Sequence, residues 1–552
     1  MDMLDTMQDD ELLRSDMQRH ERLVCERAPY ENVWRDIEER LGDNSGAFGG
    51  NMTPGRVRGQ ANFDVTHVEG RERMAAVMTD ICTPESQQYI RARFGDPDLQ
   101  KLPSVQRWCE RASDRLYAIR YAPHAGFGVS VNEDWRQSIA LGTSPVWNGV
   151  YPDGRGLFYS TLHLSSCYID TDFSGMVNIV HRRMCEPVSF YRDMFGAGGL
   201  TPKMQKAWEE KKYTQEFEVI HMVCPNYDIK SDRMGWQAMP IASRYLAVDE
   251  KIYLKVSGFH TMPISVSRHS TNAFEKYGRG VMIRVLPTID GLNTMRRTAL
   301  RSMHKQADPA LAFFDDDGIT SLVTKPGGLN PGLVDENGRL MVQAIPGGGD
   351  LSVAMLGISE ERQVVDDAFL GMMFKMLRDD KVQRSAQAVL EIASEKGIVV
   401  GPFARRYASE KQNPLTQRDL DLAMRAGQIE PFPPEVLEAG THPIIEYENP
   451  LAVMARAEQN AGFTRWIEAL APLAQTDGGQ VFDYINTDVA VPGLAEGFGV
   501  RASYVATPDE LAAKRQARED AKQEAAGVDQ LATAAGAYAD LAKGNQLIGE
   551  RV

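Results

Sequence analysis

The order of apolar and charged residues predicts helices at the start of the chain and strands after them. Apolar residues recur at helical spacing within Asp9–Leu41, Val65–Ile81 and Ser104–Ala122. Pro29 should interrupt the first of these helices, because proline has no N–H to donate inside a helix. Short runs rich in β-branched and aromatic residues then predict strands as far as about Ser267, at Pro145–Tyr151, Gly156–Leu164, Ser166–Asp170, Met176–Arg182, Phe217–Val223 and Lys251–Val256.

Two further helices enclose a long segment rich in turns. The first, Val285–Gln306, ends before Asp308-Pro309, and the second runs from Ile358 to about Leu377. Between them, Leu311–Asp350 is too long for a plain connector, so it should be functional or contact other chains. Packing against other copies would cover apolar surface that each helix alone exposes. The apolar positions are Ile289, Leu292, Met295, Ala299 and Met303, then Val364, Val365, Ala368, Phe369, Met372, Met373 and Met376.

Composition and charge narrow the function classes. The chain has 552 residues, of which 43% are hydrophobic, and a formal net charge of −15. This charge excludes a protein that coats DNA generically, because such binding depends on many Lys and Arg side chains. The six cysteines form no C-x-x-C pair and are typical of reduced thiols. The pattern of a signal peptide and long apolar runs are both lacking, so we expect neither secretion nor a membrane span.

The motifs that carry catalysis or metal binding are not satisfied. The sequence has no phosphate-binding G-x-x-x-x-G-K-[ST], no H-E-x-x-H and no G-x-S-x-G. Asp315-Asp316-Asp317-Gly318 resembles the start of a calcium loop, but two of the required oxygen ligands would fall on Phe313 and Thr324. An acidic turn after an apolar strand is the more economical interpretation. We therefore expect no enzyme, no metal and no cofactor.

Several short blocks, in collinear order over roughly Tyr30 to Glu519, resemble a known family. The blocks are Tyr30-Glu31-Asn32-Val33-Trp34, Phe63-Asp64-Val65-Thr66, Cys82-Thr83-Pro84, Ile139-Ala140-Leu141-Gly142-Thr143, Lys276-Tyr277-Gly278-Arg279-Gly280, Leu286-Pro287-Thr288-Ile289-Asp290-Gly291-Leu292-Asn293, Lys325-Pro326-Gly327-Gly328-Leu329-Asn330, Ile345-Pro346-Gly347-Gly348-Gly349 and Gly397–Arg406. Together they resemble the head-to-tail connector, or portal, proteins of short-tailed bacteriophages. The sequence departs from the family pattern at Arg384–Val389 and after about Asp520.

The resemblance implies an α+β fold in an elongated subunit with a helical stem, a turn-rich clip, a mixed α/β wing and an α-helical crown. Such subunits form a ring, dodecameric in the family, at one capsid vertex around a channel for double-stranded DNA. The expected segments are the wing at 1–277, stem helices at 278–307 and 351–378, the clip at 308–350, a channel loop and wing helix at 379–430, the crown at 431–506 and an Ala-rich C-terminal helix or tail at 507–552.

The same resemblance implies partners and a location. The partners would be further copies of the chain, a tail adaptor, a terminase packaging motor, scaffold and major capsid proteins, and the DNA in the channel, with no membrane. The protein would be assembled in the host cytoplasm and reside in the virion. ATP hydrolysis would come from the motor, because this chain has no phosphate-binding loop.

Two sets of basic residues are candidates for the stem and channel. Lys375, Arg378, Lys381 and Arg384 recur every three residues near the end of the second helix. They could touch passing phosphates, or they could be a solvated helix end that favours cations. Arg296, Arg297, Arg301 and Lys305 on the first helix are better explained by ion pairs to Glu360, Glu361 or Asp366 of a neighbouring stem.

Contact candidates in the clip are Lys325, Asn330, Asp335 and Arg339, which would meet the adaptor or the motor. At the C-terminus, Thr507-Pro508-Asp509-Glu510 is a capping box that should start an Ala-rich helix at Leu511. Two alternatives stay open: a carboxylate-based hydrolase with nonlocal catalytic residues in the β-rich part, and another phage structural component such as a tail adaptor.

Overall fold

The structure is a computed structural model. It describes residues 3–42, 48, 62–100, 102–227, 229, 235–313, 322–323, 325, 327–330, 333–334, 337–345, 351–371, 400–447, 465–470, 472, 485–497, 504–506 and 510–523, with the backbone alone for 3–10.

The chain forms two compact units, each containing helices and strands. The first comprises Met1–Tyr89 and Leu116–Gln428, and the second comprises Ile90–Arg115 and Ile429–Val552. The predicted α+β class is confirmed. The division differs from the contiguous wing expected over 1–277, because residues 90–115 group with the chain after residue 429.

The second unit joins segments that are far apart in sequence. Strand β1 (Ile90–Phe94) pairs antiparallel with β12 (Pro443–Tyr447). Trp108, on α4 (Pro103–Arg120), packs against Phe432 with ring centroids 5.0 Å apart, and its indole N–H donates to the Glu430 carbonyl at 3.0 Å. The remaining described helices of this unit are α3 (Pro97–Gln100), α13 (Pro434–Ala439), α15 (Thr487–Gly497), residues 465–470 and residues 510–523.

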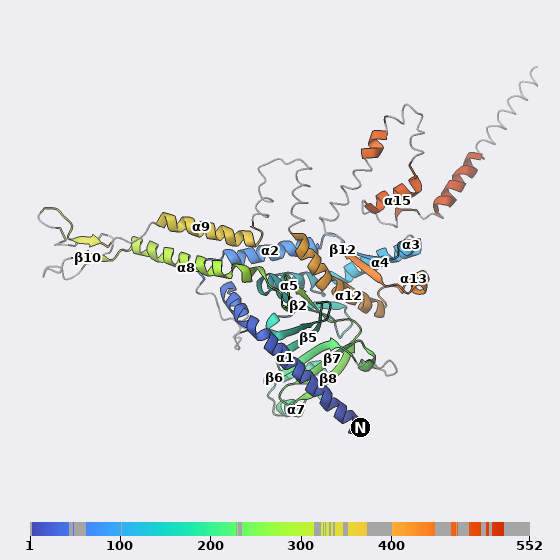
Figure 1. Ribbon diagram of the computed structural model, residues 1–552, viewed down its shortest axis with the longest axis horizontal. Coiled ribbons are helices and arrows are strands. Elements are labelled where there is room, and N and C mark those ends of the chain that lie inside the picture. The colour runs from blue at the N-terminus through green and yellow to red at the C-terminus, as the bar shows by residue number, and fades with distance from the viewer. Residues whose placement is uncertain are drawn as a thin grey trace, which may run out of the picture. The chain divides into compact units, whose positions relative to one another are not determined.

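A five-stranded antiparallel sheet is the largest sheet of the first unit (Figure 1). Its strands follow chain order, because each is joined to the next by a hairpin or a short excursion. The hairpin after β5 contains α6 (Val188–Phe195) and α7 (Pro202–Glu209). The strands are β4 (Cys167–Thr171), β5 (Val177–Pro187), β6 (Glu216–Pro225), β7 (Ile241–Ala247) and β8 (Ile252–Phe259).

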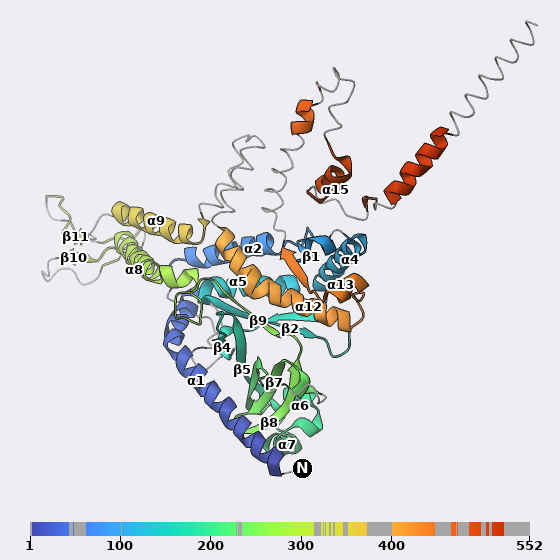
Figure 2. The same ribbon diagram turned by 45° about the vertical axis from the view of Figure 1, so that its right-hand side comes forward.

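Alternating residues of this sheet face two different helical layers. On β6, Phe217 and Val219 pack with Tyr191 of α6 and Met204 of α7. Ile220 and Met222 lie on the opposite face, where Leu13 and Met17 of α1 (Met3–Leu41) cover them. Figure 2 shows α1 running along the sheet. The sequence analysis predicted β4, β5, β6 and β8 of this sheet but missed β7, which is buried along nearly its whole length and shows no alternation.

The predicted interruption at Pro29 is wrong, because α1 is continuous through it. Proline still removes one helical hydrogen bond, to the carbonyl of Cys25. Contacts beside it hold the helix together. The Arg27 guanidinium donates to the carbonyls of Leu164, Ser165 and Cys167 at 2.8–3.2 Å.

A smaller sheet and two helices form the centre of the first unit. Its strand order is β3–β2–β9, from β3 (Leu157–Thr161), β2 (Thr143–Val150) and β9 (Ile264–Arg268). Against it pack α5 (Phe127–Leu141), which the sequence analysis missed, and α2 (Thr66–Cys82). Beyond them a helical stretch from Val400 passes through a π-helical turn, Ala408–Gln412, into α12 (Asn413–Arg425).

Helices α8 (Val281–Ala307) and α9 (Leu351–Ala368) lie side by side in both ribbon views (Figures 1 and 2). The far ends of the two helices are linked by the segment that holds the short hairpin β10 (Leu311–Phe313) and β11 (Val342–Ala344). Ile289, Leu292 and Ala299 of the predicted stripe are buried, as are Val365 and Phe369. Met303 and Val364 are instead exposed.

The helices of the described residues include none that is long and apolar enough to cross a membrane. Within the same residues no group of three or more His, Cys, Asp or Glu side chains could hold a metal ion. The acidic run Asp315–Asp317 lies outside the described residues.

Buried histidines lie on both faces of the large sheet. His181 on β5 stacks on His20 of α1, with ring centroids 5.6 Å apart. On the other face, His221 stacks on Tyr245 at 3.9 Å and bonds the Ser243 hydroxyl at 2.9 Å. Burial lowers the pKa of His181 well below its usual value and lowers that of His221 to about 3.

We expect stability to fall as the pH drops below about 6.5, the ordinary histidine pKa. Below this pH the histidines of the unfolded chain bind protons, whereas the buried rings of the folded protein stay neutral. The contribution of these histidines to the free energy of unfolding is therefore complete above this pH and is lost on acidification. For His221 alone the loss at pH 5.5 is about 1.4 kcal/mol. Urea unfolding at pH 7.5 and 5.5 should show a smaller pH dependence for His221→Phe than for wild type. An equal dependence would contradict this role of His221.

Candidate functional site

Three sequence blocks meet where α8 begins. Tyr277 is buried, and its ring centroid lies 5.3 Å from that of Tyr30 and 5.2 Å from that of Trp34, both on α1. The Trp34 indole N–H donates to the carbonyl of Leu141, at the end of α5, at 3.0 Å. We call this place the glycine junction, formed by Tyr30, Trp34, Ile139–Thr143 and Lys276–Gly280.

Backbone contact between glycines gives the junction its name. A Cβ on Gly278 would overlap the Gly142 carbonyl oxygen, and a Cβ on Gly280 would lie 2.6 Å from the carbonyl oxygen of Ala140. Gly142 ends α5 in the left-handed region, at φ 86°. The Gly278 N–H donates to the Thr143 hydroxyl at 2.8 Å. Only glycine allows this approach, so the two blocks fix the start of α8 against the end of α5.

Asn293 connects α8 to the segment before α2. Its side-chain oxygen accepts from the N–H groups of Phe63 and Asp64, at 2.9 and 3.2 Å. Asp64 is buried and pairs with Arg362 of α9 at 2.6 Å. Burial disfavours ionised Asp64, but bonds from Thr66 and Arg362 outweigh it and lower the pKa of this carboxyl. One short segment therefore holds α8 and α9 together at their base.

Asp366 is placed differently from our expectation. It is buried and pairs with Arg73 of α2, at 2.8 Å, within the same chain. Nearby, the Phe369 ring fills the space that a side chain at Gly70 would occupy. Because a buried carboxylate needs its partner, Asp366 joins α9 to α2 and is no longer a candidate for pairing between subunits.

The π-helical turn points three consecutive side chains into the protein. The Lys411 ammonium is fully buried and contacts Asp134 at 2.9 Å and the carbonyls of Ser144 and Ser265 at 2.8 and 2.9 Å. Burial lowers its pKa, and Asp134 opposes that effect. Glu410 pairs with Arg268 at 2.8 Å, and the Gln412 amide donates to the Cys82 carbonyl at 2.7 Å. The turn thus anchors the chain that follows residue 399 to both the sheet and α2.

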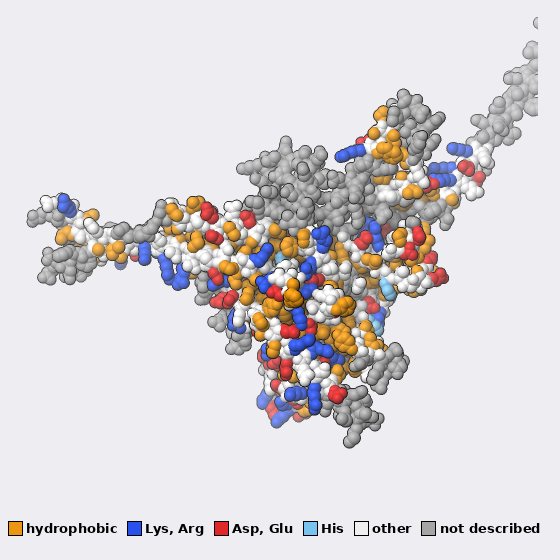
Figure 3. Space-filling view, viewed as in Figure 1, with side chains coloured by type: hydrophobic (Ala, Val, Ile, Leu, Met, Phe, Trp, Pro, Cys, Tyr) orange, Lys and Arg blue, Asp and Glu red, His pale blue; other side chains and the backbone are white. Residues whose placement is uncertain are grey.

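The other stem candidates lie on the exposed surfaces of α8 and α9. Arg297 and Arg301 are exposed, Arg296 is half-buried, and Arg297 lies over the Phe63 ring at 5.8 Å. Glu360 is exposed and Glu361 is half-buried. Within the described part of the chain, none of these five forms an ion pair. Figure 3 shows hydrophobic side chains along α9 and basic ones along α8.

The structure describes three of the clip candidates and none of the channel candidates. Lys325 and Arg339 are exposed, whereas the Asn330 side chain closes a turn through two hydrogen bonds to the Val323 backbone, at 2.7 and 2.8 Å. Asp335 and the whole channel set, Lys375, Arg378, Lys381 and Arg384, lie outside the described residues.

Comparison with known proteins matches these features to a family. The sequence profile described as "Bacteriophage head to tail connecting protein" matches residues 15–505. The chain belongs to this family. The "Portal protein" of Salmonella phage epsilon15 is 23% identical over 91% of this chain and 90% of its own length. The "Probable portal protein" of Bordetella phage BPP-1 is 24% identical over 92% and 91%.

Among solved structures, a chain of "Neck of empty GTA particle computed with C6 symmetry" matches at 11% identity, with a TM-score of 0.36 over 73% of this chain and 87% of that one.

Membership of this connector family confirms the predicted resemblance and the predicted portal function. The family is structural, and its members are virion components that form a ring at the connection of phage head and tail. Nothing supports the two alternatives, a carboxylate-based hydrolase or a tail adaptor.

The glycine junction predicts a strong effect of one methyl group. Gly278→Ala should destabilise the subunit by about 3 kcal/mol or more, because its Cβ overlaps backbone atoms that cannot move independently. Gly128→Ala, in α5 with open space around it, is the control and should be neutral or stabilise by up to about 1 kcal/mol. Urea unfolding followed by circular dichroism measures both. Similar stability of the two variants would exclude a steric role for the junction.

Proposed function

We propose that this protein is the non-enzymatic portal of its phage, a dodecameric ring at one capsid vertex. The ring provides the channel through which double-stranded DNA enters and leaves the head, and it docks the packaging motor and then the tail. The observation that carries the proposal is the family match over residues 15–505. ATP hydrolysis belongs to a partner motor, because the chain has no phosphate-binding loop.

Helices α8 and α9 form the stem of each subunit. Their shared face is apolar and buried, whereas Val353 and Leu356 of α9 are 66% and 63% exposed. Two adjacent apolar side chains on a helix favour burial against a neighbour. The unpaired cations of α8 and the carboxylates Glu360 and Glu361 of α9 would then face each other between subunits and set the register.

Charge on the exposed apolar face of α9 should break the ring. The double variant Val353→Lys and Leu356→Lys introduces two like charges per interface, so rings should be replaced by smaller species while the subunit stays folded. Val129→Lys is the matched control, because Val129 is an exposed helical valine, at 68%. Negative-stain microscopy and light scattering give ring content. Intact rings in the double variant would remove α9 from the proposed interface.

The channel's narrowest part involves Lys375, Arg378, Lys381 and Arg384, which follow α9 in sequence. The described chain resumes at Val400, and the π-helical turn that follows is fixed by buried contacts through Glu410, Lys411 and Gln412. A few cations in an otherwise acidic ring would centre the DNA without holding it, since excess negative charge disfavours adhesion.

The clip is residues 308–350, at the joined ends of α8 and α9. Exposed apolar side chains gather here, including Leu329 at 89% and Leu340 at 70%. Together with the exposed Lys325 and Arg339 they offer a mixed apolar and charged surface of the kind that binds proteins, and Asp335 belongs to the same segment in sequence. The motor and the tail adaptor would use this surface in turn. Scaffold and major capsid proteins would meet the ring during assembly in the host cytoplasm.

Shortening the clip should separate ring formation from tail attachment. In the variant, a four-residue Gly/Ser turn replaces residues 314–341 and leaves the pairing of Phe313 with Val342 intact. Rings should form normally, because the stem contacts are untouched, but phage carrying the variant should yield heads without tails. Electron microscopy of lysates counts both. Normal tail attachment would contradict the clip assignment.

A further inference from the structure

Two phenylalanines of the first unit are completely exposed, and both lie on tight turns. Phe173 is in the turn between β4 and β5, and Phe274 is in the loop between β9 and α8. They have exposed fractions of 104% and 107%, higher than any other large hydrophobic side chain of the described residues. An isolated exposed leucine or valine needs no explanation, but two fully exposed aromatic rings on neighbouring turns do.

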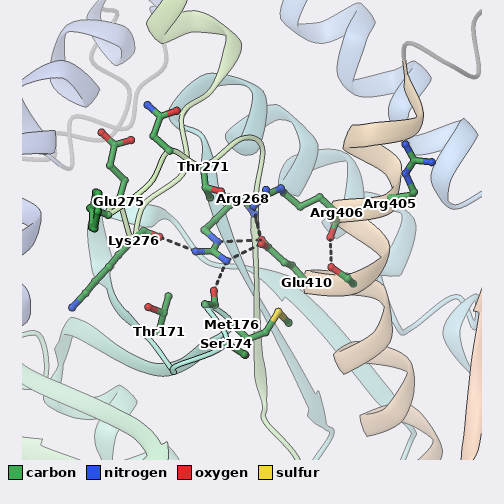
Figure 4. Close-up of a pocket in the computed structure, with 14 residues that line it drawn as sticks. Thr171, Ser174, Met176, Arg268, Thr271, Glu275, Lys276, Arg405, Arg406 and Glu410 are labelled. Carbon is green, nitrogen blue, oxygen red and sulfur yellow. Dashed lines mark hydrogen bonds and ion pairs between the residues drawn. The ribbon is translucent and has the colours of Figure 1, made fainter.

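One buried arginine fixes both turns. Arg268, at the end of β9, donates to the carbonyl of Gly175 at 2.6 Å and to that of Lys276 at 3.3 Å. Its Nε–H and one Nη2–H donate to Glu410, as Figure 4 shows. Asp172 also accepts from the N–H groups of Ser174 and Met176, at 2.8 and 3.0 Å. The two rings are therefore presented on preorganised turns, which lowers the entropic cost of binding through them.

Phe274 also has an unfavourable backbone conformation. Its φ is 67°, in the left-handed region where glycine is the usual residue of such a turn. The Glu275 N–H closes the turn on the Asn272 carbonyl at 3.2 Å. Glycine at position 274 would relieve the strain and remove the exposed ring. The subunit alone gains nothing from phenylalanine here, so the reason for it lies in a contact outside the subunit.

A hollow of about 730 Å³ beside Phe274 is lined by charged side chains, of which Lys276 is already paired with Glu26 and Asp170, both at 2.6 Å. Four cations and two carboxylates line it, and a second hollow, which Phe173 lines, adjoins it at Thr171. Glu410 is shared by Arg268 and Arg406. Arg405 is exposed and has no ion pair among the residues that the structure describes. The hollow thus fits a carboxylate that comes with apolar surface.

We propose that Phe173, Phe274 and Arg405 form a docking surface for a second copy of this chain, the adjacent subunit of the ring. The inference rests on the proposed function and deepens it by naming an interface away from the stem.

Charge complementarity favours a second copy as the occupant. Each copy carries 76 acidic residues against 61 basic ones, so a second copy has carboxylates in excess with which Arg405 could pair. DNA fits this surface less well, because the exposed rings of Phe173 and Phe274 need apolar partner surface that a phosphate backbone does not offer. The surface also lies next to the start of α8, where the Arg279 N–H donates to the Ser270 carbonyl at 2.7 Å. Contacts made here would continue directly into the stem.

The experiment compares subunit stability with ring stability. Phe274→Gly should keep or raise the unfolding temperature of the subunit, since it relieves a left-handed phenylalanine, yet it should weaken the ring. Phe173→Ala with Phe274→Gly should raise the subunit concentration at which rings dissociate about tenfold or more. Arg405→Glu should also weaken the ring. Phe190→Ala, at a phenylalanine of α6 that is 40% exposed, is the control and should leave the ring unchanged.

Mass photometry across a dilution series measures ring dissociation, and differential scanning fluorimetry measures subunit stability. Rings of the Phe variants that dissociate at the wild-type concentration would overturn the inference and leave the proposed function intact. Normal rings that fail later in head assembly would equally overturn it, because the surface would then serve another virion chain. Wild-type protein that never forms rings would instead overturn the proposed function.

Discussion

The close approach of Gly142 and Gly278 is the constraint on which the first unit depends. The two backbones meet without room for a Cβ, so the end of α5 and the start of α8 are held in direct backbone contact that only glycine permits. Tyr277, between the glycine contact and Trp34, carries that arrangement to α1. Because α8 begins at this point, the direction in which it starts is set by atoms of the backbone and not by interchangeable side chains.

Buried ion pairs also fix how distant segments of the first unit are arranged. Lys411 with Asp134, Arg268 with Glu410 and Arg362 with Asp64 each join segments more than a hundred residues apart. Ion pairs of this kind contribute little net stability, since desolvation offsets their attraction, but a misplaced partner would leave a charge buried alone. They are better understood as selecting one arrangement. In a ring each subunit contacts two neighbours, so a misfolded subunit would disturb both contacts. Such selectivity therefore matters more than added stability.

The exposed features of the same unit point outward to other molecules. Val353 and Leu356 on α9, the apolar clip residues, and the rings of Phe173 and Phe274 all leave apolar surface in water. Their supports differ. The α9 residues lie on a straight helix, whereas the phenylalanines lie on turns held by Arg268. If both proposed interfaces form, one along α9 and one at the phenylalanine turns, each subunit would be held to its neighbours at two places and would resist tilting about either.

By itself, the sequence determined the local elements and the family. Runs of β-branched and aromatic residues marked most strands of the first unit, helical spacing marked α2, α8 and α9, and the ordered short blocks identified a connector protein. Local pattern failed where distant contacts decide. Pro29 stays helical because Arg27 is held by carbonyls from residues 164–167. β1 pairs with β12, and the sequence analysis missed this because pairing between distant segments leaves no local signature. The spacing around Asp366 predicts a surface charge, yet this carboxylate is buried against Arg73.

Only the tertiary structure brought Gly142 to Gly278 and both phenylalanine turns to Arg268, because side-chain spacing reports which face of an element is apolar and not which element will cover it.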